Sequence, residues 1–261
     1  MRATLTFFRF MAQTPQADIA GTGTGNLDYE SLGVDVFDAD AQTPPPTLAS
    51  HGFQAVPFSC ARPEAGLTPE FKRQFAKACA AAVRQQTGAA LVTVLPGTVL
   101  LRRTDGAKSE APLFVSHNDF TPGSATLRAD RLSAAAGGRK PTRYAAFNAW
   151  WLARPGPQDR PLALCDANTI APSDLQYGQV KVLNPDKSVL DFGEIAYQRY
   201  NPRHRWYWYP RLGPGRLLLF CGFDSDPTRP SMVTHCAFAN PACPPDAPPR
   251  VSVECRLMAF W

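Results

Sequence analysis

Two histidines and one aspartate have the residue types and the spacing of a metal site. His117 and Asp119 stand two positions apart at the end of the short apolar run 111–120. In a strand, side chains at such spacing project from the same face, so both can reach one point above a sheet. His235 lies 118 residues downstream of His117 (235 − 117 = 118), inside the apolar run 233–238. Two imidazoles and one carboxylate form the facial triad with which non-haem iron(II) oxygenases hold a co-substrate and dioxygen.

A basic residue and a hydroxyl on the last predicted strand suit the binding of a carboxylate. Arg250 and Ser252 have the same parity there, and arginine offers a bidentate fork where lysine offers a point charge. A 2-oxoglutarate oxygenase needs such a fixed cation for the distal carboxylate of its co-substrate. Arg256 shares this parity and is a rival for the same role.

The same residues also have plainer interpretations. His117 and Asp119 could belong to a surface turn, His235 could be a hydrogen-bonded core histidine, or the three could hold zinc. The remaining histidines, His51 and His204, stand in polar connectors, and we expect them to be solvated or hydrogen-bonded rather than ligands.

Four further residues are candidates for substrate contact. Asn148 and Trp150 share one strand face, and Tyr207 and Tyr209 share a face of the aromatic run 206–209. The alternative for the tyrosines is packing, because aromatic residues are favoured in strands for packing alone.

The clearest element of secondary structure is a helix over about 69–87. Thr68 is a good N-cap, Pro69 suits the first helical position, and apolar residues recur at helical spacing from Phe71 until Gly88. The Thr121-Pro122 pair repeats this signature and predicts a second helix over 123–136. The remaining patterned segments are typical of strands, namely 4–11, 90–95, 98–103, 143–152, 161–165, 206–209, 217–220, 233–238 and 251–260.

These elements predict a protein that is mainly β with added helices, built on a double-stranded β-helix (jelly-roll, cupin-like) core. The 26 prolines and the 19% of charged residues also disfavour a helical bundle. We expect a single domain over 1–261, in which 1–90 is an N-terminal extension carrying the first helix and 91–261 is the jelly-roll core.

Composition excludes several classes of partner. The net charge is +5, but the basic residues are scattered without a run of five, so no nucleic-acid partner is expected. No apolar run is long enough to cross a bilayer, and the first residues do not resemble a signal peptide. With neither feature, we expect a cytoplasmic protein. The seven cysteines contain no C-x-x-C pair, so we expect buried, reduced thiols.

Several separated segments, in this order, together resemble one known family. They are 117–121, 148–151, 161–166, 204–210, 217–225, 234–238 and 250–256. The family is that of the AsaB-like hydroxylase/desaturase proteins, which include CmcJ and gibberellin-desaturase-like fungal enzymes. The resemblance implies a double-stranded β-helix oxygenase that uses iron(II), 2-oxoglutarate and dioxygen to hydroxylate or desaturate a small molecule, commonly in secondary metabolism. This chain departs from the family at 153–157, where relatives usually have Arg-Pro soon after the first tryptophan.

Two other functions compete with this interpretation. A methyltransferase or accessory subunit would usually need a glycine-rich loop between a strand and a helix, and the nearest candidate, 21–25, follows no clear strand. A metal-binding cupin without 2-oxoglutarate chemistry is the second alternative. Arg250 and Ser252 discriminate against it, because such a protein has no need for a carboxylate clamp.

Overall fold

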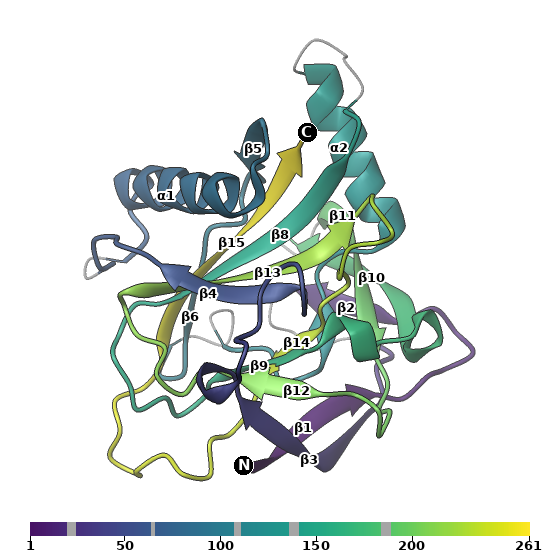
Figure 1. The fold of residues 1–261 in the computed structure, drawn as a ribbon. Helices are drawn as coiled ribbons and strands as arrows, with labels where there is room; N and C mark the ends of the chain where they lie inside the picture. The colour runs from purple at the N-terminus through teal and green to yellow at the C-terminus, as the bar shows by residue number, and fades with distance from the viewer. Residues whose placement is uncertain (20–24, 64–65, 107–110, 136–140, 184–188) are drawn as a thin grey trace.

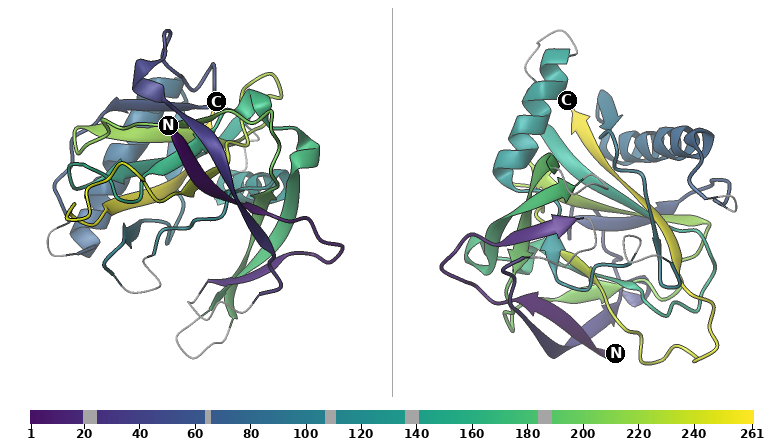
Figure 2. Two further views of the ribbon diagram at one scale, coloured as in Figure 1. Left: turned by 90° about the horizontal axis from the view of Figure 1, so that it is seen from below. Right: turned by 180° about the vertical axis from the view of Figure 1, so that it is seen from behind.

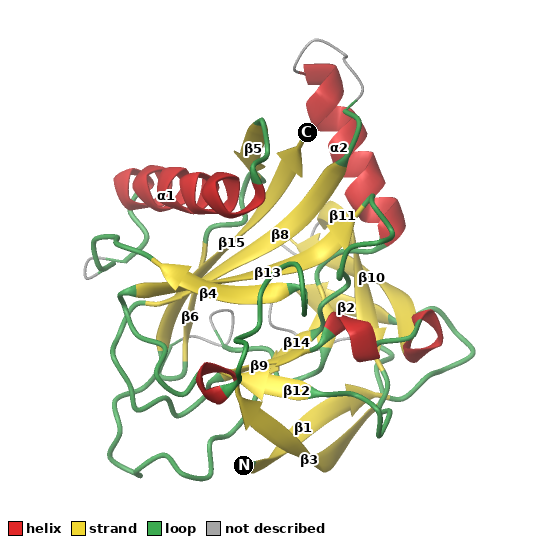
Figure 3. Ribbon diagram, viewed as in Figure 1, coloured by secondary structure: helices red, strands yellow, loops and turns green. Residues whose placement is uncertain are grey.

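The computed structural model describes residues 1–19, 25–63, 66–106, 111–135, 141–183 and 189–261. Two β-sheets lie face to face and two helices flank one of them (Figures 1 and 3). The six-stranded sheet has the order β4 (Phe53–Pro57), β13 (Arg216–Asp224), β8 (Tyr144–Leu152), β15 (Val251–Phe260) and β5 (Leu91–Val94), and β6 (Leu100–Arg103) also pairs with β15.

The nine-stranded sheet carries the shorter strands of the site. Its order is β1 (Arg2–Phe8), β3 (Tyr29–Asp38), β12 (Trp206–Trp208), β9 (Leu162–Cys165), β14 (His235–Ala237), β7 (His117–Asn118), β11 (Val189–Gln198), β10 (Leu175–Leu183) and β2 (Gln16–Ile19). In the described part of the chain, 3-10 turns lie at Ala39–Ala41, Ala167–Thr169 and Pro172–Asp174. Because β1, β2, β3 and β4 pair within these sheets, the segment before residue 91 is part of the same two layers as the rest of the chain.

The two faces of β8 pack against different parts of the molecule. Phe147, Ala149 and Trp151 point outward and pack against α1 (Pro69–Thr87), which lies across the sheet (Figure 1). Trp150 points the other way, into the layer between the sheets. This alternation follows from the two-residue period of a strand. It places an apolar core on one face of the sheet and leaves the other free to carry a site.

Both predicted helices are present. In α1 the Thr68 hydroxyl accepts a hydrogen bond from the Phe71 backbone N–H at 3.1 Å, and Gly88 ends the helix at φ 68°. Such a left-handed backbone favours glycine, which has no Cβ. The second helix, α2 (Pro122–Ala135), packs Ala125 and Ala129 against the far end of the inner face of the sheet, as the back view in Figure 2 shows.

The predicted class, mainly β with two helices and a double-sheet core, is confirmed. The sequence analysis missed β2, β3, β4, β10 and β11. All seven cysteines are free thiols, and five of them are buried, whereas Cys60 and Cys243 are half-buried. Among the described residues, no helix is long and apolar enough to span a membrane.

Candidate active site

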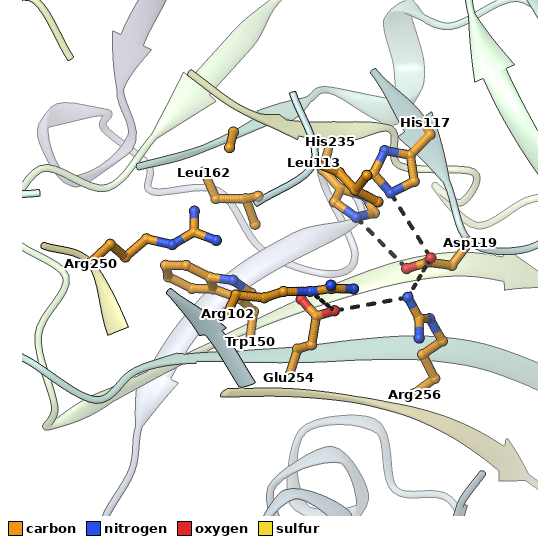
Figure 4. A pocket seen from close by; sticks show the side chains of 11 residues that line it. Arg102, Leu113, His117, Asp119, Trp150, Leu162, His235, Arg250, Glu254 and Arg256 are labelled. Atoms are coloured by element: carbon orange, nitrogen blue, oxygen red, sulfur yellow. Dashed lines mark hydrogen bonds and ion pairs between the residues drawn. The ribbon is translucent and has the colours of Figure 1, made fainter. Parts of the chain in front are cut away.

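The structure brings His117, Asp119 and His235 together. His117 on β7 and His235 on β14 are register partners in neighbouring strands, and their ring centroids lie 4.4 Å apart. Asp119 follows the end of β7, and its carboxylate oxygens lie 3.9 Å from His117 Nε2 and 3.7 Å from His235 Nε2. Figure 4 shows both imidazoles directed at this carboxylate.

Asn118 fixes the turn that presents Asp119. Its side-chain amide donates a hydrogen bond to the Gly222 carbonyl at 2.7 Å, and its oxygen accepts one from the Phe120 N–H at 3.1 Å. A Cβ on Gly222 would lie 2.5 Å from the Phe120 ring, so only glycine allows this close approach. The turn after β7 is thus held by β13 of the facing six-stranded sheet.

The donor set fits a divalent metal ion. One atom of each residue lies within 4.8 Å of the others. His117 Nδ1 lies 2.8 Å from the Val115 carbonyl, a contact that leaves Nε2 as the free ligand atom. Metal bonds of about 2.1 Å would draw adjacent ligand atoms to roughly 3 Å from one another, a small contraction from the present geometry. Two imidazoles and one carboxylate are a donor set typical of non-haem iron(II).

Both oxygens of Asp119 are held from behind. Arg256 Nη2 donates to Oδ1 at 2.6 Å, and Asn148 Nδ2 donates to Oδ2. Burial alone would raise the pKa of Asp119, but the charge of Arg256, with the two histidines, outweighs it and holds that pKa well below its usual range. The carboxylate is therefore ionised and oriented before any ligand arrives.

His235 is a neutral imidazole at physiological pH. Its side chain is buried, and burial together with the neighbouring His117 lowers its pKa to about 3. A neutral ring presents a lone pair to a metal ion without first losing a proton.

Arg250 is buried, and its guanidinium forms no ion pair with a carboxylate in the part of the chain that the structure describes. Its side chain is 4% exposed, its Nη1 donates to the Arg160 carbonyl at 2.6 Å, and its guanidinium lies over the Trp150 ring at 5.3 Å. Asp159 accepts a hydrogen bond from its backbone N–H at 2.9 Å. Arg250 Nε and the buried hydroxyl of Ser252 have no hydrogen-bond partner among the described residues. Burial lowers the pKa of Arg250 to about 10, so it remains charged at neutral pH. Such a pair is suited to a carboxylate ligand.

Two charged residues that the sequence analysis missed complete the polar side of the pocket. Glu254 on β15 accepts a hydrogen bond from Arg102 Nε at 3.1 Å and lies 3.9 Å from Arg256 Nη2. Figure 4 shows this row of side chains along the floor, with Arg250 at the far end from Asp119. Glu254 shares a strand face with Ser252 and Arg256, and this alternation could have identified it from the sequence. No comparable signal points to Arg102, which is 152 positions away from Glu254.

Apolar side chains complete the lining of the same pocket. Leu162 and Ala237 come from the nine-stranded sheet, whereas Trp150 on β8 is the register partner of Glu254 and lies beside it (Figure 4). Leu113 also lines the pocket and is 44% exposed. Of the residues proposed for substrate contact, Trp150 thus lies in the pocket and Asn148 acts on Asp119.

The two tyrosines lie elsewhere. Tyr207 and Tyr209 are buried in the core beside Phe53, and neither lines the pocket. The other histidines are hydrogen-bonded, as expected. His204 Nε2 lies 3.1 Å from Asp174 Oδ2, and His51 Nδ1 lies 2.8 Å from the Ser50 hydroxyl.

Comparison with known proteins gives consistent relationships over the whole chain. Residues 5–260 match the family model described as oxidoreductase/YMDC permease-like domain. The hydroxylase/desaturase efuI of Hormonema carpetanum is 30% identical over 100% of this chain and 95% of its own length. The Fe(II)/2-oxoglutarate-dependent dioxygenase nvfI of Aspergillus novofumigatus is 28% identical over 92% of this chain and 87% of its own length.

A solved structure agrees with these relationships. The iron and alpha-ketoglutarate-dependent endoperoxidase NvfI superposes with a TM-score of 0.87 at 26% identity, covering 100% of this chain and 97% of that one. The similarity therefore includes both sheets and the helices as well as the segments that carry the site.

Proposed function

Because the chain belongs to the oxidoreductase/YMDC permease-like family, with full-length relatives among the iron(II)/2-oxoglutarate-dependent hydroxylases and desaturases, we propose how its pocket performs that chemistry. His117, Asp119 and His235 hold iron(II), and Arg250 with Ser252 binds the distal carboxylate of 2-oxoglutarate. The substrate is a small molecule of secondary metabolism.

The observation that carries this proposal is the buried Arg250, whose guanidinium forms no ion pair with a carboxylate among the described residues. The charges of Glu254 and Asp159 favour its charged form only from farther away. A buried cation without an ion-pair partner costs free energy, and a buried hydroxyl without a hydrogen-bond partner adds to that cost. Both costs are offset when a ligand carboxylate binds there. Arg250 and the three metal-binding residues line one pocket, so a single co-substrate can span from the clamp to the metal ion.

Arg256 is assigned a different role. Its guanidinium is committed to Asp119, and this charge together with Glu254 raises its pKa above the ordinary value despite its burial. We propose that Arg256 and Asn148 hold Asp119 in the orientation that the metal needs, and that Arg250 is the carboxylate clamp.

Held by His117, Asp119 and His235 and by the Arg250 clamp, iron(II) and 2-oxoglutarate would supply, with dioxygen, the oxidation of the substrate, coupled to conversion of 2-oxoglutarate to succinate and carbon dioxide. The chain itself positions the reactants and excludes water. Leu162 and Ala237 on one sheet and Trp150 on the other provide apolar surface against which an apolar part of the substrate can lie. The half-exposed Leu113 stands at the mouth of the pocket.

Anaerobic titration of the iron(II)-loaded protein with 2-oxoglutarate tests the assignment. We expect a visible iron(II)–2-oxoglutarate charge-transfer band, and succinate formation once air is admitted. Substitution of His117 or Asp119 by alanine should abolish both signals. Full succinate formation by either variant, or no band with the wild-type protein, would contradict the assignment.

A further inference from the structure

A buried amide side chain lies behind the two histidines of the site. Gln198 ends β11 and is completely buried. Its Oε1 accepts hydrogen bonds from the Ser116 hydroxyl at 2.7 Å and from the Thr234 hydroxyl at 2.6 Å. These two residues immediately precede His117 and His235. One carboxamide oxygen therefore joins the two chain segments that carry the imidazoles.

The alternation of the strands puts Gln198 on the face opposite the pocket. Ser116 and His117 are consecutive, as are Thr234 and His235, so each hydroxyl projects away from the imidazole that follows it. The Gln198 N–H also donates to the Ser116 carbonyl at 3.1 Å. Gln198 thus contacts neither the pocket nor its ligands, and acts on the histidines only through their neighbours.

The strands themselves provide little to fix the register here. β7 has two residues and β14 has three, and among the described residues His117 and His235 form the one register pair between them. A slip of one residue would turn an imidazole to the wrong face of the sheet. A side-chain connection that spans both segments opposes such a slip.

A second group of polar residues fixes the orientation of the amide. Gln198 Nε2 lies 3.3 Å from His204 Nδ1 and 3.2 Å from His204 Nε2. Because His204 Nε2 also lies 3.1 Å from the Asp174 carboxylate, which can only accept, Nε2 carries the proton and Nδ1 is the ring atom that can accept from Gln198. Burial lowers the pKa of His204, in keeping with a neutral ring. With Nε2 directed at His204, Oε1 must face the two hydroxyls. Every member of this network is nine-tenths or more buried, so water does not compete for these hydrogen bonds.

From this arrangement we propose that Gln198 is a positioning residue, which holds His117 and His235 in register for metal binding through the hydroxyls of Ser116 and Thr234. The proposal rests on the metal site of the proposed function. It differs from a general stabilising role because it requires an effect on metal affinity in protein that is folded.

Titration of the full chain with cobalt(II) tests the proposal without any turnover. Gln198→Met keeps the shape of the side chain but removes its hydrogen bonds, and we expect cobalt(II) affinity to fall about 10–100-fold with an altered visible spectrum. Gln158→Met is the matched control, since Gln158 is also buried and donates to the Tyr209 carbonyl. It should lower stability while leaving the affinity and spectrum unchanged.

The hydroxyl partners provide an independent route if Gln198→Met fails to fold. Ser116→Ala and Thr234→Val should each weaken cobalt(II) binding, and the loss in the double variant should be smaller than the sum of the two, because both changes remove the same connection. Wild-type affinity and spectrum in these variants, while His117→Ala abolishes binding, would overturn the role of Gln198. Equal binding by wild type and His117→Ala would instead overturn the metal site.

Discussion

Asn148 and Arg256 are directly opposite each other in the pairing of β8 with β15, and each holds a different oxygen of Asp119. A cross-strand pair thus serves as a cradle for a carboxylate that lies on the other sheet. Because the neighbouring positions on both strands pack against α1, this cradle is anchored in the largest apolar core of the molecule.

Loss of the Arg256 charge should weaken the metal site. In Arg256→Met the burial of Asp119 is no longer opposed by a guanidinium, so its pKa rises and a proton competes with the metal ion. We expect cobalt(II) affinity to fall about 10–100-fold, and more at pH 6 than at pH 8. Calorimetric titration measures this. Arg143→Met is the control, because Arg143 pairs with Asp224 outside the pocket; equal affinities in all three proteins would contradict the role.

Replacement of Arg250 should weaken 2-oxoglutarate binding without lowering the stability of the ligand-free protein. Arg250→Met removes an unpaired buried charge, so the ligand-free protein should be as stable as wild type or more stable by about 1 kcal/mol. Binding of 2-oxoglutarate to the iron(II)-loaded variant should fall by at least 100-fold, while metal affinity is retained. Urea denaturation and the charge-transfer band provide the two measurements. Unchanged 2-oxoglutarate affinity would exclude Arg250 as the clamp.

The features that sequence predicted best have strong local signals. The helix over 69–87 is bounded by a cap, a proline and a glycine, and its bounds agree with α1. The last strand, 251–260, alternates cleanly and matches β15. By contrast, β3 has a largely exposed face with charged residues, and so lacked the apolar pattern of a buried strand.

The contacts between distant segments account for what sequence missed. Alternation showed that Tyr207 and Tyr209 share a face but not that this face meets Phe53 in the core. It likewise placed Asn148 toward the interior without identifying Asp119 as its partner. The Arg102–Glu254 pair and the Gln198 network join segments far apart in the chain, and only the packing of the two sheets brings them together.

The metal-free protein should lose stability on mild acidification. The pKa of His235 is about 3 in the folded state and about 6.5 in an unfolded chain, so unfolding takes up a proton between these values. The stabilisation that comes from keeping His235 neutral is complete above pH 6.5 and is lost as the pH falls. We expect the free energy of unfolding to fall between pH 6.5 and about 5, above the range of ordinary carboxylates.

Urea denaturation across that pH range checks this expectation. His235→Asn should make the decline in unfolding free energy with falling pH shallower. Part of the decline should remain, because burial also lowers the pKa of His204. Identical slopes in wild type and His235→Asn would show that His235 is not kept neutral by its surroundings.

Two adjacent tryptophans should respond differently to the same substitution. Trp151 packs against Phe75 of α1 and donates to the Pro214 carbonyl at 2.8 Å, so Trp151→Phe should cost about 1–3 kcal/mol of unfolding free energy and leave 2-oxoglutarate affinity unchanged. Trp150 lies under Arg250, so Trp150→Phe should weaken 2-oxoglutarate binding by about 0.5–2 kcal/mol. Denaturation and anaerobic titration measure the two effects, and a larger loss of 2-oxoglutarate affinity in Trp151→Phe would contradict the division between the faces of β8.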